Sequence, residues 1–404
     1  MPDFLIVFLL LLAAAYVALL LAYRLGWSRT PAFSLEEMNN IGRDSFPQRR
    51  SAGSDAMNQP DVFNNPEDLL LPTVSVIIPA RNEAAHIGAC LAALKRQHYP
   101  EHLLEIIVVN DASEDDTAAI AAGFEGVKIL DLKAEKGMVA YKKMALSAGI
   151  AHSKGKWIVT TDADCVAGEN WLLSLALFHQ QTNARMIAAP VVFEEKSGLL
   201  SVFQSLDFMT MQGITGAVLR YRLGSMANGA NLAFTRAAFE SVKGYEGATH
   251  LASGDDYLLM NKLRITHKEG LFYLKSKAAI VTTQPQPDLT SFFNQRVRWA
   301  SKSGKYKDPG VTLMLLLVYV FNLSLLAFFV SGFWQTEAWR WLWKILVIKT
   351  FAELLLLYPV ADFFERKKQL WYFPFLQPLH TLYVVTAGFF GMIGTYSWKG
   401  RKVR

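Results

Sequence analysis

Uncharged apolar runs lie at both ends of the chain, and they constrain its architecture more than any other feature of the sequence. Phe4 to Tyr23 is the first run, and Val311 to Phe333 is the clearest of the C-terminal group. Each is as long as the roughly 20 residues that an α-helix needs to cross a bilayer. The chain is 52% hydrophobic and only 19% charged, which is more apolar than one water-soluble core requires. We therefore expect an integral membrane protein with spanning helices at both ends.

The charges that flank the first run predict its orientation. Asp3 precedes the run, whereas Arg24 and Arg29 follow it, which is the reverse of the order in a secretory signal peptide. Because basic residues mark the cytosolic side, the polar middle of the chain is predicted to be cytosolic. The two cysteines suit a reducing compartment. The short chain favours a bacterium, and hence the bacterial inner (plasma) membrane.

Four regions follow from this patterning. Residues 1–29 are predicted to be an anchor, 30–71 a polar tether, 72–300 a cytosolic domain, and 301–404 a membrane region with about three apolar segments. Basic residues cluster beside the apolar segments, so the net charge of +6 indicates contact with membrane lipid and not with nucleic acid. The last segment, Phe373 to Tyr396, contains two prolines. We expect it not to cross fully, because a crossing would place the basic C-terminus outside.

Between residues 72 and 283, short β-branched runs alternate with helical patterns, as in a mostly parallel sheet that is covered by helices. The predicted strands are Val74 to Ile78, Ile106 to Val109, Val127 to Leu130, Trp157 to Thr161 and Met186 to Val192. A helix should follow the first strand, because Ile87, Leu91 and Leu94 share one face. In such sheets a ligand binds beyond the carboxyl ends of the strands. The polar residues at these ends are therefore the candidate site.

An acidic pair, Asp162 and Asp164, follows the fourth predicted strand. Both carboxylates should lie at one edge of the sheet, where together they could hold Mg²⁺ or Mn²⁺ bridging two phosphates. Acidic residues at strand ends also cap helices. The pair therefore needs support from other motifs.

Three further motifs provide that support. Asp111 follows a buried strand and could accept hydrogen bonds from a nucleobase or ribose. Lys142 and Lys143 lie between the acidic motifs, where a cation could meet a diphosphate. Asp255 and Asp256 open a predicted helix, so they either cap it or supply a catalytic base.

One helical turn near residue 297 presents an amide, a guanidinium and an indole, from Gln295, Arg298 and Trp299. This combination suits a phosphate or sugar site better than a buried core. The apolar stretch 198–223 leaves two interpretations open. It is either core packing or a helix at the membrane surface.

Taken in order, these motifs resemble those of the family 2 glycosyltransferases, inverting enzymes that include cellulose, hyaluronan and poly-N-acetylglucosamine synthases and ceramide glucosyltransferase. The resemblance covers about residues 72–300. It implies an α/β fold of the GT-A type, a Rossmann-like nucleotide-sugar-binding domain with a mostly parallel central sheet, here joined to N- and C-terminal transmembrane helices. Residues 295–299 are similar to the Gln-x-x-Arg-Trp signature of the membrane-embedded branch.

The resemblance also implies a role for each matching residue. Nucleotide-sugar binding is implied for Pro79, Arg81, Glu83, Asp111, Lys143 and Asp162. Metal binding is implied for Asp164 and Asp162, with Asp164 the more direct ligand. Asp256 is implied as the base that takes the acceptor proton. Contact with the diphosphate or the acceptor is implied for Asn231, Asp255, Gln295, Arg298 and Trp299. The family often has glycine before the lysine pair, where this chain has Tyr141.

The expected activity is metal-dependent, inverting transfer of a sugar from a nucleotide diphosphate sugar, with UDP as the expected nucleotide. The expected acceptor is a lipid, a lipid-linked group or a glycan at the cytosolic membrane face, and a processive polysaccharide synthase is the alternative. A transporter or scaffold with a degenerate transferase domain would have lost an acidic motif, and none is lost. A nucleotidyltransferase has no need of the motif at 295–299.

Overall fold

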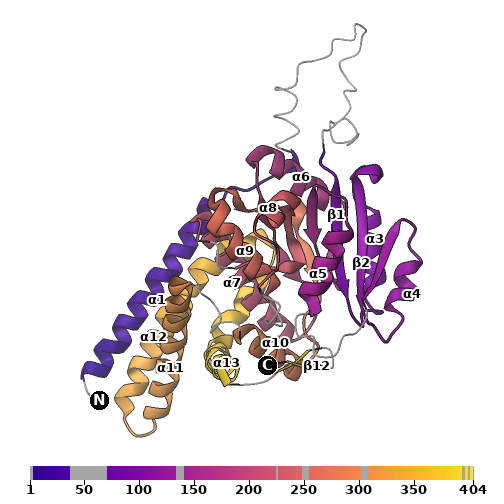
Figure 1. The fold of residues 1–404 in the computed structure, drawn as a ribbon. Helices are drawn as coiled ribbons and strands as arrows, with labels where there is room; N and C mark the ends of the chain where they lie inside the picture. The colour runs from indigo at the N-terminus through magenta and orange to yellow at the C-terminus, as the bar shows by residue number, and fades with distance from the viewer. Residues whose placement is uncertain are drawn as a thin grey trace.

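The computed structural model describes residues 3–36, 71–132, 141–223, 226–247, 254–301, 308–393, 396–398 and 401–403. Most of the predicted tether lies outside these residues, as do several of the basic residues at the C-terminus. Within the described chain an α/β part lies beside a group of long helices. Three of these helices, α1, α11 and α12, extend side by side away from the α/β part (Figure 1).

Seven described strands form the central sheet, in the order β3-β2-β1-β4-β8-β6-β9. They are β1 (Val74–Ala80), β2 (Leu104–Asp111), β3 (Val127–Leu132), β4 (Trp157–Thr160), β6 (Met186–Ala188), β8 (Leu232–Thr235) and β9 (Leu271–Tyr273). β8 is antiparallel to both of its neighbours, and the other pairs are parallel. Ala80 lies beside Asn110, and Ile77 lies beside Thr160. The carboxyl ends of β1, β2 and β4 therefore meet at one edge, as the sequence predicts.

A smaller sheet contains β5 (Val166–Ala167), β10 (Val281–Thr283) and β7 (Val191–Phe193). The prediction of a single strand from Met186 to Val192 is wrong, because the chain leaves the central sheet after β6 and enters the small sheet as β7. Pro190 lies at this break, and proline has no N–H to continue a ladder. Its carbonyl instead accepts a hydrogen bond from the Val281 N–H at 3.0 Å.

Short helices cover the central sheet. They are α3 (Ile87–Lys95), α4 (Thr117–Ala122), α5 (Tyr141–His152), α6 (Trp171–Thr182), α8 (Arg236–Ser241) and α9 (Asp255–His267). The predicted face of the first of these is confirmed, because Ile87, Leu91 and Leu94 are all buried. α10 (Leu289–Ala300) follows the sheets and packs against the last long helix, α13 (Phe373–Ile393).

Three described segments are long and apolar enough to cross a membrane: Asp3–Arg29 (α1), Pro309–Ser331 (α11) and Lys367–Ile393. The last of these includes α13, which runs on past Pro378. The two prolines therefore do not interrupt the helix, and the expectation that this segment does not cross the membrane fully stays a prediction. α12 (Thr336–Phe363) contains buried charges and lies beside α1 and α11. The side on which the C-terminus lies stays a prediction.

The long helix α7 (Leu199–Arg220) joins the α/β part to the long helices, because it packs against β7, β9, α1 and α12. Two glycines allow close approach at these crossings. A Cβ added to Gly213 would lie 2.6 Å from Val360 Cγ2, and one added to Gly216 would lie 2.8 Å from Trp27 Cε3. Of the two interpretations of residues 198–223, the structure supports core packing.

We predict that Gly216→Ala destabilises the protein, because the new Cβ overlaps the indole of Trp27 on α1. Overpacking of this kind costs about 1–3 kcal/mol, so thermal unfolding of the purified protein in detergent should begin at a lower temperature. Gly88→Ala is the matched control on α3, since its Cβ would meet only Ile120 Cγ2 at 3.6 Å. Equal unfolding temperatures for the two variants would contradict the prediction.

Candidate active site

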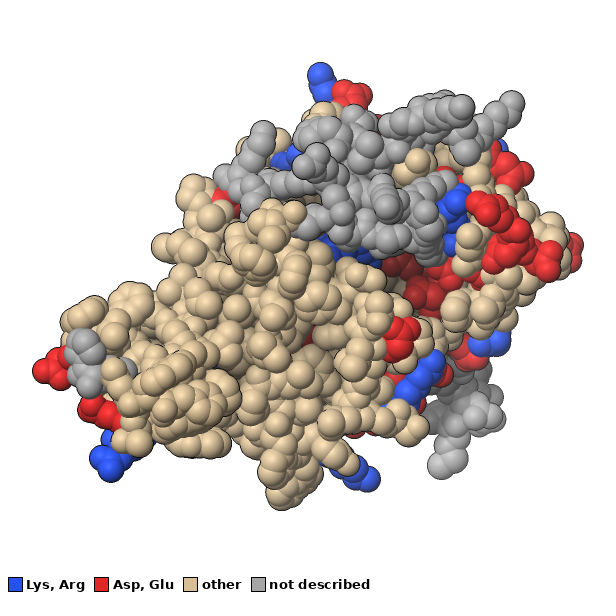
Figure 2. All heavy atoms as spheres, turned by 90° about the horizontal axis from the view of Figure 1, so that it is seen from below, with Lys and Arg blue, Asp and Glu red and all other residues tan. Residues whose placement is uncertain are grey.

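A cavity of about 770 Å³ opens at the carboxyl edge of the central sheet. Its polar half is lined by residues from β1, β2, α5, the loop after β4, and α9: Pro79, Arg81, Glu83, Asp111, Lys142, Asp162, Asp164, Asp255 and Asp256. Figure 2 shows acidic side chains gathered in a recess of the α/β part. Gln295, Arg298 and Trp299 of α10 also line the cavity. The structure thus brings together every predicted site residue except Lys143 and Asn231.

Arg81 follows β1 and reaches across to the end of β2. Its Nη1 donates hydrogen bonds to the carbonyls of Asp111 at 2.8 Å and Ala112 at 2.6 Å. Ala112 has a φ of 50°, a left-handed conformation that costs an alanine roughly 1–2 kcal/mol. Arg81 therefore stabilises a strained turn and sets the position of Asp111 at the edge of the cavity.

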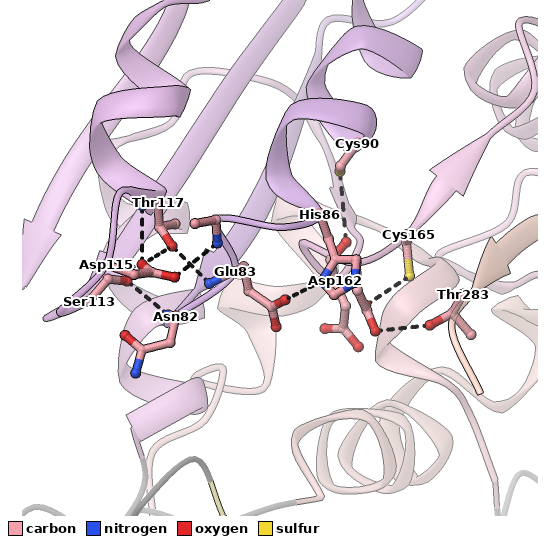
Figure 3. A network of polar contacts seen from close by, with 12 residues as sticks. Asn82, Glu83, His86, Cys90, Ser113, Asp115, Thr117, Asp162, Cys165 and Thr283 are labelled. Carbon is pink, nitrogen blue, oxygen red and sulfur yellow. Dashed lines mark hydrogen bonds and ion pairs between the residues drawn. The ribbon is translucent and has the colours of Figure 1, made fainter. Parts of the chain in front are cut away.

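Two side chains hold the carboxylate of Asp164, and both of them, Thr283 and Cys165, are labelled in Figure 3. Thr283 Oγ1 at the end of β10 donates to its Oδ2 at 3.1 Å, and the Cys165 thiol donates to its Oδ1 at 3.6 Å. Burial, and then the charges of Asp162 and Glu83, raise the pKa of Asp164. A nearby cation would stabilise the charged form of this carboxyl group, because it offsets the repulsion from Asp162 and Glu83.

Both cysteines are buried, and neither forms a disulfide. Burial, followed by the charge of Asp164, raises the pKa of Cys90 to about 12, and the same two causes raise the pKa of the Cys165 thiol. They therefore stay protonated beside the acidic pair. Cys90 donates to the Asp162 carbonyl at 3.8 Å.

Lys142 lies among the carboxylates of the cavity and forms an ion pair with Asp162 Oδ1. Burial lowers the pKa of this lysine, but the charges of Asp162, Asp255 and Asp256 outweigh burial and raise it. Lys143, by contrast, is 1% exposed and does not line the cavity. The assignment of nucleotide-sugar binding to Lys143 is therefore corrected. Successive helical residues point about 100° apart, and here Lys142 faces the cavity while the side chain of Lys143 is buried.

Asp255 and Asp256 form the first turn of α9, after Gly254 in a left-handed conformation with a φ of 86°. The positive end of the helix dipole stabilises both negative charges. Asp256 Oδ1 accepts a hydrogen bond from the Tyr257 N–H at 2.7 Å. A Cβ on Gly229 would lie 3.1 Å from Asp255 Oδ2, so the loop before β8 lies against this turn.

Asn231 is wholly buried and holds three other segments together. Its Nδ2 donates to the carbonyls of Pro190 and Ala279, both at 2.8 Å, and its Oδ1 accepts from Trp171 Nε1 at 2.9 Å. It does not line the cavity, whereas the preceding Asn228 does. The predicted role of Asn231 at the acceptor or diphosphate is corrected, because its hydrogen bonds are made within the core.

The second half of the cavity is apolar and lies between α11 and α13. Its lining comprises Val311, Met314, Leu315, Leu316, Val318, Tyr319, Tyr383, Val384, Ala387, Gly388 and Met392. The sequence does not reveal this groove, since it is formed by two helices that the whole of α12 separates along the chain. One cavity thus runs from a charged sheet edge to a surface of the long helices.

The residues at the edge fit a divalent cation whose coordination is completed by a substrate. Among the described residues, no group of three or more His, Cys, Asp or Glu side chains is placed to hold a metal ion. Asp162 and Asp164 supply hard oxygen donors, and Mg²⁺ is usually bound through one or two carboxylates together with substrate phosphates.

The fold is GT-A-like, with an α/β architecture, a mostly parallel central sheet and a polar site at the carboxyl ends of its strands. A mannosyltransferase structure from Pyrobaculum calidifontis, solved with GDP-Man and Mn²⁺, aligns over 96% of this chain and 99% of its own, with a TM-score of 0.54 and 16% identity. Residues 75–242 match the family described as Glycosyl transferase family 2. The part of the chain that holds the sheet and most of the polar site is therefore similar to the family 2 glycosyltransferases.

Curated relatives agree with this similarity. A probable glycosyltransferase from Bacillus subtilis, YdaM, is 30% identical over 57% of this chain and 55% of its own length. A poly-β-1,6-N-acetyl-D-glucosamine synthase from Staphylococcus epidermidis is 24% identical over 56% of this chain and 53% of its own. The chain thus spans somewhat over half of these relatives.

We predict that Asn231→Ala lowers the free energy of unfolding, because two buried carbonyls and an indole N–H lose their partner. Each unsatisfied buried group costs about 1–3 kcal/mol. Thermal unfolding in detergent measures the loss, with Asn294→Ala, an exposed asparagine on α10, as control. An unfolding temperature equal to that of the control would show that Asn231 does not stabilise the core.

Proposed function

We propose that this protein transfers a sugar, with inversion, from a nucleotide diphosphate sugar to a lipid or lipid-linked acceptor at the cytosolic face of a membrane. The observation that carries the proposal is the single cavity that joins the charged edge of the sheet to the apolar groove between α11 and α13. A charged donor and an apolar acceptor need these two environments side by side.

The donor end would bind the nucleotide diphosphate. Asp111 would accept hydrogen bonds from the nucleoside, Lys142 would meet the diphosphate, and Asp162 and Asp164 would hold Mg²⁺ or Mn²⁺. The cation would supply positive charge that, with that of Lys142, stabilises the departing diphosphate. The structural neighbour solved with GDP-Man and Mn²⁺ supports this choice of cofactor. UDP is the nucleotide that the family resemblance favours.

Asp256 is proposed as the base. It lines the cavity at the amino end of α9, from which it would take the acceptor hydroxyl proton as that oxygen attacks the anomeric carbon. The bond to the diphosphate oxygen breaks in the same displacement, so the configuration inverts and no covalent intermediate with the protein forms. Asp255 is more buried and would orient the acceptor.

The acceptor end would admit a hydrocarbon chain from the bilayer. Its groove is formed by two segments that are apolar and long enough to cross a membrane. Trp299 and Gln295 line the same cavity, and would contact the head of the acceptor.

Polymer synthesis is the second candidate, favoured by the similarity to a poly-β-1,6-N-acetyl-D-glucosamine synthase. Product length separates the two candidates. The purified protein in lipid nanodiscs, given a panel of radiolabelled UDP- and GDP-sugars, should yield a lipid-extractable product with one added sugar. A ladder of longer products would favour the synthase, and transfer to water-soluble acceptors alone would overturn the lipid proposal.

We predict that Val384→Trp blocks transfer, because the larger side chain fills the groove between α11 and α13. Transfer to a lipid acceptor should fall at least about tenfold, as expected when an acceptor is misplaced near the reacting centre, while nucleoside-diphosphate affinity stays unchanged. Leu382→Trp, on the exposed face of the same helix, is the matched control and should transfer normally. Equal transfer rates for the two variants would show that the acceptor does not bind in the groove.

We predict that Asp256→Asn keeps nucleoside-diphosphate affinity but lowers turnover by about a hundredfold or more, the usual contribution of a positioned base. Asp255→Asn should cost less. Asp164→Asn should weaken affinity as well, because it removes a metal ligand, and excess EDTA should reproduce that loss.

Calorimetry of nucleoside-diphosphate binding beside transfer rates compares these three variants. Near-normal turnover of Asp256→Asn would refute the assignment of Asp256 as the base. Full activity in excess EDTA would refute the requirement for a divalent cation.

A further inference from the structure

A group of buried polar side chains lies between the long helices, away from the donor site. Lys349 and Glu353 on α12 form an ion pair at 2.9 Å, and both are buried. Gln377 on α13 accepts from Lys349 and donates to Glu353, each at 2.5 Å. The Tyr16 hydroxyl on α1 also donates to Glu353. These contacts join three helices by charged and polar groups.

A second buried ion pair lies where α10 meets α7. Arg296 Nη2 is 2.7 Å from Asp207 Oδ2, with the two side chains 1% and 7% exposed. His380 lies three residues after Gln377 on α13, and its Nε2 is 3.9 Å from Asp207 Oδ1. Residues three apart on a helix are neighbours on one face, so His380 lies beside Gln377, the partner of Glu353. His380 therefore lies between the two pairs, which together hold two cations and two carboxylates.

Stability alone does not explain why two ion pairs are buried here. Burying an ion costs several kcal/mol, and apolar residues of similar volume often replace a buried pair without loss of stability. The contacts of Arg296 suggest another reason. Its guanidinium lies 4.2 Å from the Trp299 ring centroid, and its Nη1 donates to Gln295 Oε1 at 3.3 Å. Gln295 and Trp299 both line the cavity.

We propose that Arg296 is a positioning residue that sets Gln295 and Trp299 in the cavity, and that Asp207 and His380 connect it to the polar group on α12. This inference rests on the proposed function, since it assigns these contacts to sugar transfer. Asp207 fixes one edge of the guanidinium, so the other edge faces the Gln295 amide and the flat face covers the indole. A change in packing among α1, α12 and α13 would then reach the transfer site through His380.

The test separates positioning from stability with the double variant Asp207→Leu/Arg296→Met, which replaces the pair by apolar side chains. We expect its unfolding temperature to stay close to that of the wild type. Its kcat should fall about 10- to 100-fold, because the groups at the cavity are misplaced, while the KM for the donor changes less than about twofold. A double variant with both the kcat and the unfolding temperature of the wild type would overturn the proposal.

The conservative variant Arg296→Lys provides the matched comparison. It keeps the charge opposite Asp207 but loses the planar group that contacts both neighbours. We expect wild-type stability and a kcat as low as that of the double variant. A wild-type kcat would show that only the charge matters.

Hydrogen exchange gives a readout that does not need transfer. In the double variant the amides of α10 should exchange faster, while those of α11 should be unchanged. Unchanged exchange in α10 would overturn the positioning role. Absence of transfer by the wild type itself, with faster exchange in the variant, would instead refute the proposed function.

Discussion

The parallel register of β1, β2 and β4 is the constraint on which the site depends. It places Ala80 beside Asn110 and Ile77 beside Thr160, so three segments spread over about 80 residues end at the same edge. Side chains alternate between the two faces of a strand, and a slip of one residue would turn each of them to the opposite face. Arg81 adds to this constraint, because it ties the end of β1 to the turn after β2.

Charge at this edge is unbalanced in a way that favours a ligand. Asp162, Asp164, Asp255 and Asp256 line the cavity with Lys142 among them. The carboxylates raise the pKa of the lysine, while Asp164 has a raised pKa because of burial and its acidic neighbours. A divalent cation that arrived with a diphosphate would neutralise both the carboxylates and the phosphates.

The helix α7 connects this edge to the long helices. Gly213 and Gly216 let Val360 and Trp27 approach its backbone closely, and its Asp207 holds Arg296 of α10. Tightly packed interiors transmit displacement. The position of the cavity relative to the long helices is therefore set by the packing of one helix, and the charged and apolar halves of the cavity stay aligned.

The sequence by itself determined the features that depend on local pattern. Strand ends rich in Asp, the helical face of Ile87, Leu91 and Leu94, and the apolar terminal runs all follow from side-chain periodicity over a few residues, and the structure confirms these helices and the convergence of the polar strand ends. Eleven of the thirteen site residues implied by the family resemblance line one cavity.

Only the tertiary structure decided which of several polar residues with similar local sequence patterns lines the cavity and which is buried in the core. Lys142 or Lys143 faces the cavity according to how α5 is rotated against β1 and β2. Asn231 is a core residue because Pro190, Ala279 and Trp171 converge on it from distant segments. The Asp207–Arg296 pair and the groove between α11 and α13 likewise depend on contacts between residues that are far apart in the sequence. Such contacts produce no periodic pattern in the sequence around either partner, so the sequence alone does not predict them.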